Sequence, residues 1–407
     1  MPDKPELKRS ISLPLLTFYG LGNILGAGIY ILIGEVAGTS GLYTPIAFLL
    51  SAVLAAFTAF SYAELSARYP LSAGEAVYIH RGFSQIWLSR LVGLLIAVIG
   101  MVSAAAITRG FVGYLDVFII LPDWLVITLI LAAMGSLAIW GISESLRTAA
   151  VFTLLEIAGL LLIIWVAAPA LEQVPDRIPE LLPGMDWSAL HLVLPGAFLA
   201  FFAFIGFEDM VNVAEEVKNP QRTLPAAIII ALIMTTVLYI AVSLVAILAV
   251  PTETLAGSDA PLALVYRHAT GNEPVLISII SLFAVINGAL IQIIMASRVC
   301  YGMGCKRWLP LIFARVHAVT RTPVVATVSV STAVLVMALY LPIETLAKST
   351  SYFLLLVFCL VNLSLWRLKT RGEQPVGIVC VPRWIPVAGF TASLAFVLLQ
   401  GLLDLRA

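Results

Sequence analysis

The 407 residues are 61% hydrophobic and only 11% charged, and their mean hydropathy is +1.04. Soluble domains carry about 25% charged residues, so this chain lacks the surface of a soluble enzyme or a nucleic-acid-binding protein. Lys plus Arg and Asp plus Glu both number 23, and a net charge of zero gives no general attraction to nucleic acid. The apolar residues form blocks of about 20, the length that crosses a bilayer as a helix. The composition predicts an all-α, polytopic membrane protein.

Eleven membrane spans are predicted, with proline near several of their ends. No cleavage site of the signal-peptide kind precedes the first span. The spans cover residues 13–38, 42–67, 84–114, 123–141, 146–168, 189–214, 225–250, 275–301, 323–341, 346–366 and 385–404.

Lys and Arg fall unequally on the two sides of these spans. With the N-terminus inside, all of them except Arg109, Arg177, Arg267, Lys348 and Arg406 lie on the inner side. Cytoplasmic loops of membrane proteins carry such an excess of basic residues. The bias predicts a multi-pass protein of the cell inner (plasma) membrane with a cytoplasmic N-terminus, and eleven spans then place the C-terminus outside.

Two predicted spans contain glycine near their middle. The first contains Gly26-Ala27-Gly28, and the sixth contains Gly206 before the acidic pair Glu208-Asp209. Interrupted helices at matching places in two inverted halves are the sequence pattern of a transporter that binds its substrate at the bilayer midplane. Small residues four apart, such as Gly22 and Gly26, are also a helix-packing pattern. The coincidence of both interruptions with a five-span repeat favours the binding site.

The repeat defines the expected organisation of the chain. A cytoplasmic segment is followed by two inverted five-helix repeats and a peripheral C-terminal helix region. These parts cover residues 1–12, 13–168, 189–366 and 367–407.

Three motifs in order resemble those of the amino acid–polyamine–organocation (APC) superfamily, and bacterial relatives of cationic amino acid transporters most of all. They are Gly22-Asn23-Ile24-Leu25-Gly26-Ala27-Gly28-Ile29-Tyr30, the stretch from Phe201 to Glu208 with Glu215-Glu216-Val217-Lys218-Asn219-Pro220, and Ser297-Arg298 with Tyr301. The resemblance covers residues 10–366. It implies a LeuT-like fold of five plus five inverted helices, discontinuous in helices 1 and 6, and an amino acid or related amine as cargo. Family members commonly have twelve spans or more, whereas eleven are predicted here.

The backbone at the two interruptions forms the predicted substrate site. Free amides that begin a half-helix favour a carboxylate, and in the first span these are the amides of Gly26, Ala27, Gly28 and Ile29. Unwound carbonyls suit an ammonium group, and in the sixth span they lie near Phe202, Ala203 and Ile205. The family position of Phe202 implies a gate; core packing is the alternative for this ring and for Phe204 and Phe207.

Two acidic residues are candidates for coupling or gating. A charged side chain inside a membrane costs at least about 2.5–3.5 kcal/mol, so it is a functional hypothesis by default. Glu156 lies in the middle of the fifth span, where some related permeases carry a lysine. It could carry a proton, pair with a cation, or remain a neutral hydrogen-bonded acid. Glu208 stands where related exchangers have an acid for pH sensing or gating, and a solvated vestibule is the alternative.

Other polar residues allow two interpretations each. The inner end of the sixth span is either an ion-pair gate or a solvated helix end, with Glu215, Glu216, Lys218 and Arg222. Amides in the eighth and tenth spans either bond the unwound segments or link helices: Asn287, Gln292 and Asn362. Glu64 and Arg68, at i,i+4, mostly stabilise their helix.

The function expected is secondary active transport of amino acids by alternating access, with the proton as coupling ion. Sodium is less favoured because Ser278, Ser281 and Ser297 lie at unsuitable depths. An amino acid/amine exchanger and a non-transporting receptor with the same fold are the alternatives.

An enzyme is not expected, since no mid-span His accompanies a carboxylate or nucleophile. Scattered Cys and His predict no metal and no cofactor. The lipid bilayer is the expected environment. The sequence leaves open which amino acid is carried and whether the chain forms a homo-oligomer.

Overall fold

The computed structural model describes residues 7–116, 118–119, 121–140, 142–182, 187–258, 260–340, 343–372, 375 and 377–404. Side chains are not described at some helical positions, Ala27 and Phe202 among them. Within the described residues the fold is helical, and strand pairing is limited to one parallel bridge between Ile11 and Val217.

The first half of the chain holds five long helices and one short one. They are α1 (Leu13–Ser40), α2 (Thr44–Arg68), α3 (Gly74–Phe83), α4 (Ile86–Asp116), α5 (Asp123–Trp140) and α6 (Ile142–Ala167), with the 3-10 turn η1 (Gly41–Tyr43) between α1 and α2. The short helix α3 lies between the second and third predicted spans.

The second half repeats this content with additional short elements. They are η2 (Ala168–Gln173), α7 (Val174–Leu181), α8 (Trp187–Ala203), η3 (Glu208–Glu216), α9 (Pro220–Ala249), α10 (Thr252–Ala256), α11 (Pro261–Thr270), α12 (Val275–Cys305), η4 (Leu311–Ala314), α13 (Val324–Tyr340), α14 (Ile343–Thr370) and α15 (Trp384–Asp404).

The long helices correspond to the predicted spans. Among the described residues, eight helical segments are long and apolar enough to cross a membrane, and three shorter apolar segments accompany them: Leu192–Phe201, Val324–Tyr340 and Trp384–Leu399. Each of the eleven predicted spans has a counterpart among these helices. The prediction of an all-α polytopic membrane protein is therefore confirmed.

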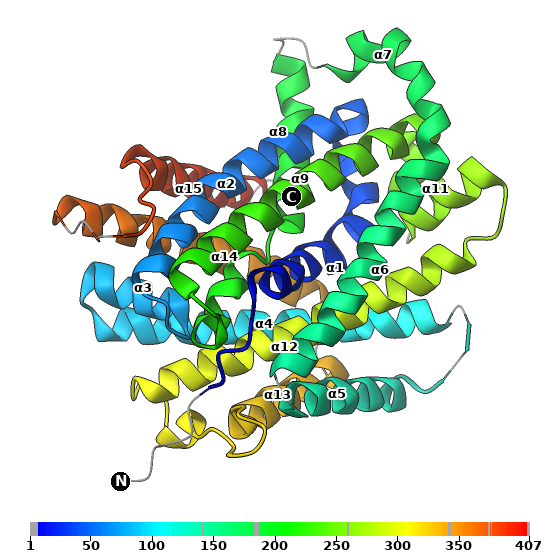
Figure 1. Cartoon of the computed structure of the whole chain (residues 1–407). Helices are drawn as coiled ribbons and strands as arrows, with labels where there is room; N and C mark the ends of the chain where they lie inside the picture. The colour runs from blue at the N-terminus through cyan, green and yellow to red at the C-terminus, as the bar shows by residue number, and fades with distance from the viewer. Residues whose placement is uncertain are drawn as a thin grey trace.

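Helix α1 lies in the centre of the bundle (Figure 1). It contacts α6, α8, α9 and α12. Its described residues from Tyr19 to Tyr30 are buried on all sides, as Tyr19, Leu21 and Leu25 illustrate. A helix that is hydrophobic all round is buried by other helices rather than facing lipid. The pair α5–α13 lies at the periphery, and so does α15, which packs on α14.

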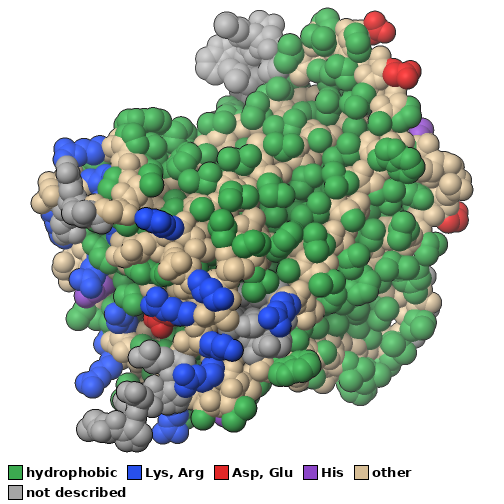
Figure 2. Space-filling view, viewed as in Figure 1, with side chains coloured by type: hydrophobic (Ala, Val, Ile, Leu, Met, Phe, Trp, Pro, Cys, Tyr) green, Lys and Arg blue, Asp and Glu red, His purple; other side chains and the backbone are tan. Residues whose placement is uncertain are grey.

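Charged side chains gather at the ends of the molecule (Figure 2). Lys and Arg cluster at the end that carries the N-terminal segment, and acidic side chains lie toward the opposite end. Apolar side chains cover the surface between them, and they include Trp165 on α6 and Val237 on α9, which are 75% and 62% exposed. This apolar surface matches the hydrocarbon layer of a bilayer.

The sixth span is interrupted as predicted. Helix α8 ends at Ala203, a turn follows, and the chain resumes as the 3-10 helix η3 at Glu208. Gly206 in the turn has φ +132°. Glycine takes this conformation without the steric cost that a Cβ atom would bring.

The first span, in contrast, is not interrupted in this structure. Helix α1 runs without a break from Leu13 to Ser40, so the expected discontinuity at Gly26-Ala27-Gly28 is not met. The glycines are explained by close packing. A Cβ atom at Gly26 would lie 3.2 Å from the backbone oxygen of Ala284 in α12, and one at Gly28 would lie 3.0 Å from Ala203 in α8. Close helix packing, the alternative to an interruption, therefore accounts for Gly26 and Gly28 in this structure.

Candidate functional site

The interruption of the sixth span packs directly on α1. The Asn23 side chain in α1 donates a hydrogen bond of 2.9 Å to the backbone oxygen of Gly206, and another to Asp209 Oδ2 at the start of η3. Gln292 of α12 donates to the same Asp209 oxygen at 2.8 Å and to Asn23 Oδ1 at 3.1 Å. These three polar side chains fix the turn between α1 and α12.

The hydroxyl group of Tyr239 in α9 joins α1 to the end of α8, next to the contacts of Asn23. It lies 2.7 Å from the backbone oxygen of Ile24 and 3.0 Å from that of Ala203, the last residue of α8. A Cβ atom at Gly28 would lie 2.8 Å from this hydroxyl oxygen. The close approach of α1 to the end of α8 therefore depends on glycine at residue 28.

The structure brings several of the predicted substrate-binding residues together. Gly28 meets Ala203, and Gly26 faces α12. Ile29 and Ala203 are buried, and Ile205 is partly buried. The side chains of Ala27 and Phe202 lie outside what the structure describes. Because α1 is continuous, the backbone amides of residues 26–29 take part in helical hydrogen bonds rather than facing a ligand.

The other two aromatic residues of the turn belong to the core. The Phe204 ring packs edge-on against Tyr239 with centroids 5.1 Å apart. The Phe207 ring packs against Tyr62 at 5.7 Å and Phe358 at 5.6 Å. Both rings are fully buried, so the packing alternative explains them.

Glu156 is fully buried in α6. Its Oε1 accepts a hydrogen bond of 2.8 Å from Asn287 of α12, and the Asn287 amide also donates to Thr153 Oγ1 at 3.0 Å. Glu156 Oε2 has no hydrogen-bond partner among the described residues. The Tyr30 hydroxyl on α1 donates to the Glu156 backbone oxygen at 2.7 Å. This carboxyl group thus lies where α1, α6 and α12 meet.

Glu208 is also buried, with 2% of its surface exposed. Its Oε2 accepts a hydrogen bond of 2.8 Å from the backbone amide of Gly206. The side chain therefore caps the turn and does not line a solvated vestibule. Asp209 is 3% exposed and makes the bonds to Asn23 and Gln292 described above. The sequence interpretation assigned no role to Asp209, because neighbouring residues on an ideal helix point in different directions; a 3-10 helix after a turn changes this.

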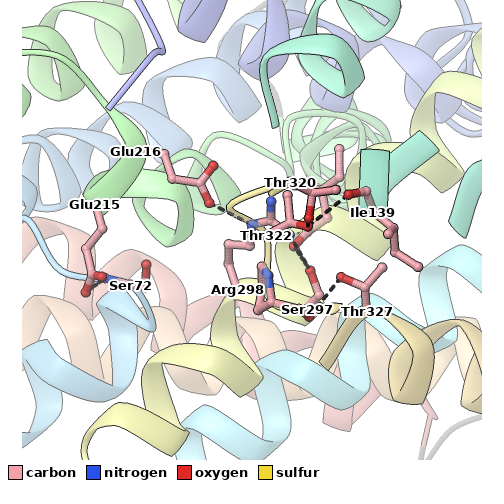
Figure 3. A network of polar contacts seen from close by, with 11 residues as sticks. Ser72, Ile139, Glu215, Glu216, Ser297, Arg298, Thr320, Thr322 and Thr327 are labelled. Carbon is pink, nitrogen blue, oxygen red and sulfur yellow. Dashed lines mark hydrogen bonds and ion pairs between the residues drawn. The ribbon is translucent and has the colours of Figure 1, made fainter. Parts of the chain in front are cut away.

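The C-terminal end of η3 takes part in a buried ion pair with α12 (Figure 3). Arg298 of α12 and Glu216 are both fully buried, and Arg298 Nε lies 2.8 Å from Glu216 Oε1. Glu215 accepts a hydrogen bond of 3.1 Å from the backbone amide of Ser72. Lys218 and Arg222, in contrast, are exposed. The ion-pair interpretation holds for Glu216, with Arg298 as the partner that sequence spacing could not identify.

A short N-terminal segment covers this ion pair. The backbone amide of Ile11 donates to the Glu216 backbone oxygen at 3.0 Å, and the Lys218 amide donates to the Ile11 oxygen at 2.9 Å. The segment therefore ties the start of α1 to the end of η3.

A second buried ionic group links α2, α14 and the segment before α15. Glu64 of α2 pairs with Arg68 at i,i+4, as expected, and with Lys369 of α14 at 2.7 Å. Its Oε2 also accepts a hydrogen bond of 2.7 Å from the backbone amide of Val381 before α15. Asn362 of α14 donates to Thr58 of α2 at 3.0 Å and so links helices rather than the interruption.

Comparison with known proteins decides the family. A family model described as amino acid permease matches residues 11–403. The chain belongs to the amino acid permease family. It is thus a multi-pass membrane transporter, and not an enzyme, as the resemblance of its motifs implied.

Individual relatives of this permease span several named functions. It is 30% identical over 394 residues to the branched-chain amino acid permease BcaP of Bacillus subtilis, covering 91% of this chain and 82% of that one. It is 29% identical to the vacuolar cationic amino acid transporter 2 of Arabidopsis thaliana, covering 91% of this chain and 62% of that one. It is 29% identical to a methylthioribose transporter of Bacillus subtilis, with 94% and 86% covered.

A solved structure establishes the fold. The crystal structure of MhsT in complex with L-phenylalanine superposes on the permease with a TM-score of 0.68, 15% sequence identity, and coverage of 97% of this chain and 98% of that one. The LeuT-like architecture is thereby confirmed.

Proposed function

We propose that this permease carries amino acids across the cytoplasmic membrane by alternating access, with the proton as coupling ion. The observation that carries the proposal is the interruption of the sixth span, packed on the glycine-rich stretch of α1 at the centre of the bundle. Two of its relatives are an amino acid permease and an amino acid transporter by name. The basic end of the molecule would face the cytoplasm.

The substrate site would lie between Gly28 and Ala203. An ammonium group suits the carbonyls at the end of α8, near Ala203 and Ile205, where it would share or replace the Tyr239 hydroxyl as donor to the Ala203 oxygen, and the covering side chain would be Phe202. A carboxylate would take the amides of residues 26–29 only if α1 opened there, because in the continuous helix those amides are bonded internally. Glycine at positions 26 and 28 lowers the cost of such opening. Local opening of α1 is therefore part of the proposed cycle.

Coupling would involve Glu156. The carboxyl group has one oxygen bonded to Asn287 and the other without a described partner. Burial of this kind disfavours the charged form of an acid unless a positive charge joins it. A proton would satisfy Glu156 in the closed bundle and leave when water enters between α1, α6 and α12. Glu208 would act as a gate by releasing the Gly206 amide.

The test is a ligand panel on the purified protein. A ligand that binds only the folded state raises the apparent melting temperature. The panel would contain the proteinogenic amino acids and common polyamines at several pH values. Stabilisation by a group of neutral or basic amino acids supports the proposal and selects the substrate for flux measurements in proteoliposomes. Absence of any stabilising amino acid, with the folded protein intact, contradicts it.

A further inference from the structure

Three buried carboxyl groups lie close together where α3 meets η3. Glu75 of α3 is 1% exposed, and Glu208 and Asp209 at the start of η3 are 2% and 3% exposed. The joint between the two elements is held by Asn212. Its Oδ1 accepts from the Gly74 backbone amide at 3.0 Å, and its Nδ2 lies 3.4 Å from Glu75 Oε1.

The charged and titratable groups around this cluster are nearly all acidic or neutral. Tyr19 of α1, Tyr62 of α2 and Tyr78 of α3 are buried close enough to these acids to feel their charge. Arg298 of α12 lies beyond Tyr19 and is already paired with Glu216. Among the described residues no ion pair includes Glu75, Glu208 or Asp209. Three buried carboxylates without a cation repel one another, so the cluster must hold fewer negative charges than carboxyl groups.

The hydrogen bonds indicate where the neutralising proton resides. Asp209 receives amide donors from Asn23 and Gln292, and Glu208 receives the Gly206 amide. Glu75 Oε1 has the long contact of 3.4 Å to Asn212, and its Oε2 has no partner in the described structure. The Tyr62 hydroxyl oxygen is likewise buried and unpartnered. Hydrogen bonds to the charged form favour it, so the acid held by the longest hydrogen bond is the one that keeps its proton.

The pKa of Glu75 agrees with a proton on this carboxyl group. Burial raises the pKa of the Glu75 carboxyl from 4.5 to about 8, and the negative charge of Asp209 adds to the effect. Among the described residues no three His, Cys, Asp or Glu side chains are arranged to hold a metal ion. The geometry therefore fits a proton at this joint.

We propose that Glu75 is a second proton-binding site of this permease, which retains its proton while α3 is closed against η3 and gives it to water when they separate. The site is distinct from Glu156, which is held by α6 and α12. Its link to transport rests on the proposed function; the binding of the proton does not. Separation of α3 from η3 would expose the carboxyl group, and water then stabilises the charged form.

The proton site is tested first without substrate. Because the folded protein keeps the Glu75 proton up to about pH 8 and an ordinary glutamate loses it near 4.5, the free energy of unfolding falls as the pH rises between these values. The apparent melting temperature of the wild type is expected to fall over this range. Glu75→Gln is expected to make the fall measurably smaller, whereas Glu253→Gln, at an exposed glutamate of α10, leaves it unchanged.

A spectroscopic readout keeps the test independent of stability. Infrared difference spectra on raising the pH to 9 should contain the loss of protonated carboxyl bands. One component of this loss is expected to be absent in Glu75→Gln and retained in Glu253→Gln and Glu156→Gln. An unchanged band and an unchanged melting profile in Glu75→Gln overturn the proposal. If both signals depend on Glu75 but no amino acid binds or moves at any pH, the proton site stands and the proposed transport function fails.

Discussion

The hydroxyl group of Tyr239 lies between the two backbone segments that form the candidate site. It is fully buried and bridges the carbonyls of Ile24 and Ala203. Such a bridge positions α1 against α8 without itself being part of either helix. The sequence does not mark this residue, because one tyrosine in an apolar helix carries no pattern that distinguishes it from an ordinary core residue.

Tyr239→Phe is expected to loosen this contact while preserving the ring packing on Phe48 and Phe204. A buried hydrogen-bonding group left without a partner costs about 1–3 kcal/mol. The apparent melting temperature and the affinity for the best amino acid of the panel should both fall. Tyr340→Phe, at a residue 77% exposed, is the matched control. Equal behaviour of the two variants would remove Tyr239 from the site.

Glu156→Gln tests proton coupling at a single residue. Glutamine can still accept from Asn287 through its carbonyl oxygen, but it cannot release a proton. Uptake into proteoliposomes is expected to lose its dependence on external pH, with ligand binding to the purified protein preserved. Flux would be measured over pH 5 to 8 beside Glu253→Gln. A pH profile like that of the wild type would assign coupling to another group.

Helix η3 is held at both of its ends by elements from distant parts of the chain. Its start is fixed by Asn23 and Gln292, and its end by Arg298 and the N-terminal segment. Because the turn after α8 interrupts the sixth span, η3 is joined more closely to these distant segments than to α8, and it is expected to move with them. The end near Glu216 would therefore open as a unit with the start of α1.

Removing one member of the buried Arg298–Glu216 pair is expected to be severely destabilising. An uncompensated buried charge costs about 3–5 kcal/mol, whereas replacing both members by apolar residues is often neutral. Arg298→Ala should thus lower the apparent melting temperature strongly. The double variant Arg298→Met with Glu216→Leu should recover most of the loss. Folding of both variants would be followed by size-exclusion chromatography and thermal unfolding, and a double variant as unstable as Arg298→Ala would contradict this account.

The distribution of charge over the whole molecule sets its expected orientation. Basic side chains gather at one end, and the apolar surface lies between the ends (Figure 2). Cys305, at the end of α12, and Cys380, before α15, are exposed, whereas Cys300 and Cys359 are buried. The two exposed thiols lie in segments that the positive-inside rule assigns to the cytoplasm.

Thiol labelling checks this orientation. A membrane-impermeant maleimide is expected to leave intact cells unlabelled and to label Cys305 and Cys380 in inverted membrane vesicles. Cys305→Ser with Cys380→Ser is the control that should abolish labelling. Reaction in intact cells would reverse the assigned topology.

Much of the architecture followed from the sequence. The number of membrane spans and the class of helical membrane protein depend on local composition, because each segment that crosses a bilayer needs a certain length of apolar helix, independently of the others. The interruption at Gly206 was also predictable, since a glycine beside two acids inside an apolar span disfavours a continuous helix locally. The pairing of Glu64 with Arg68 rests on helix spacing alone and was likewise expected.

Only the tertiary structure decided the partners of the buried polar groups. Gly26 and Gly28 permit either an interruption or close packing, and the positions of Ala284, Ala203 and Tyr239 select packing in this arrangement. Glu75 with Asp209, and Arg298 with Glu216, come from segments far apart in the chain. A sequence states which side chains can ionise, but the free energy of a buried charge depends on its donors and neighbours in space, and these exist only once the helices have packed.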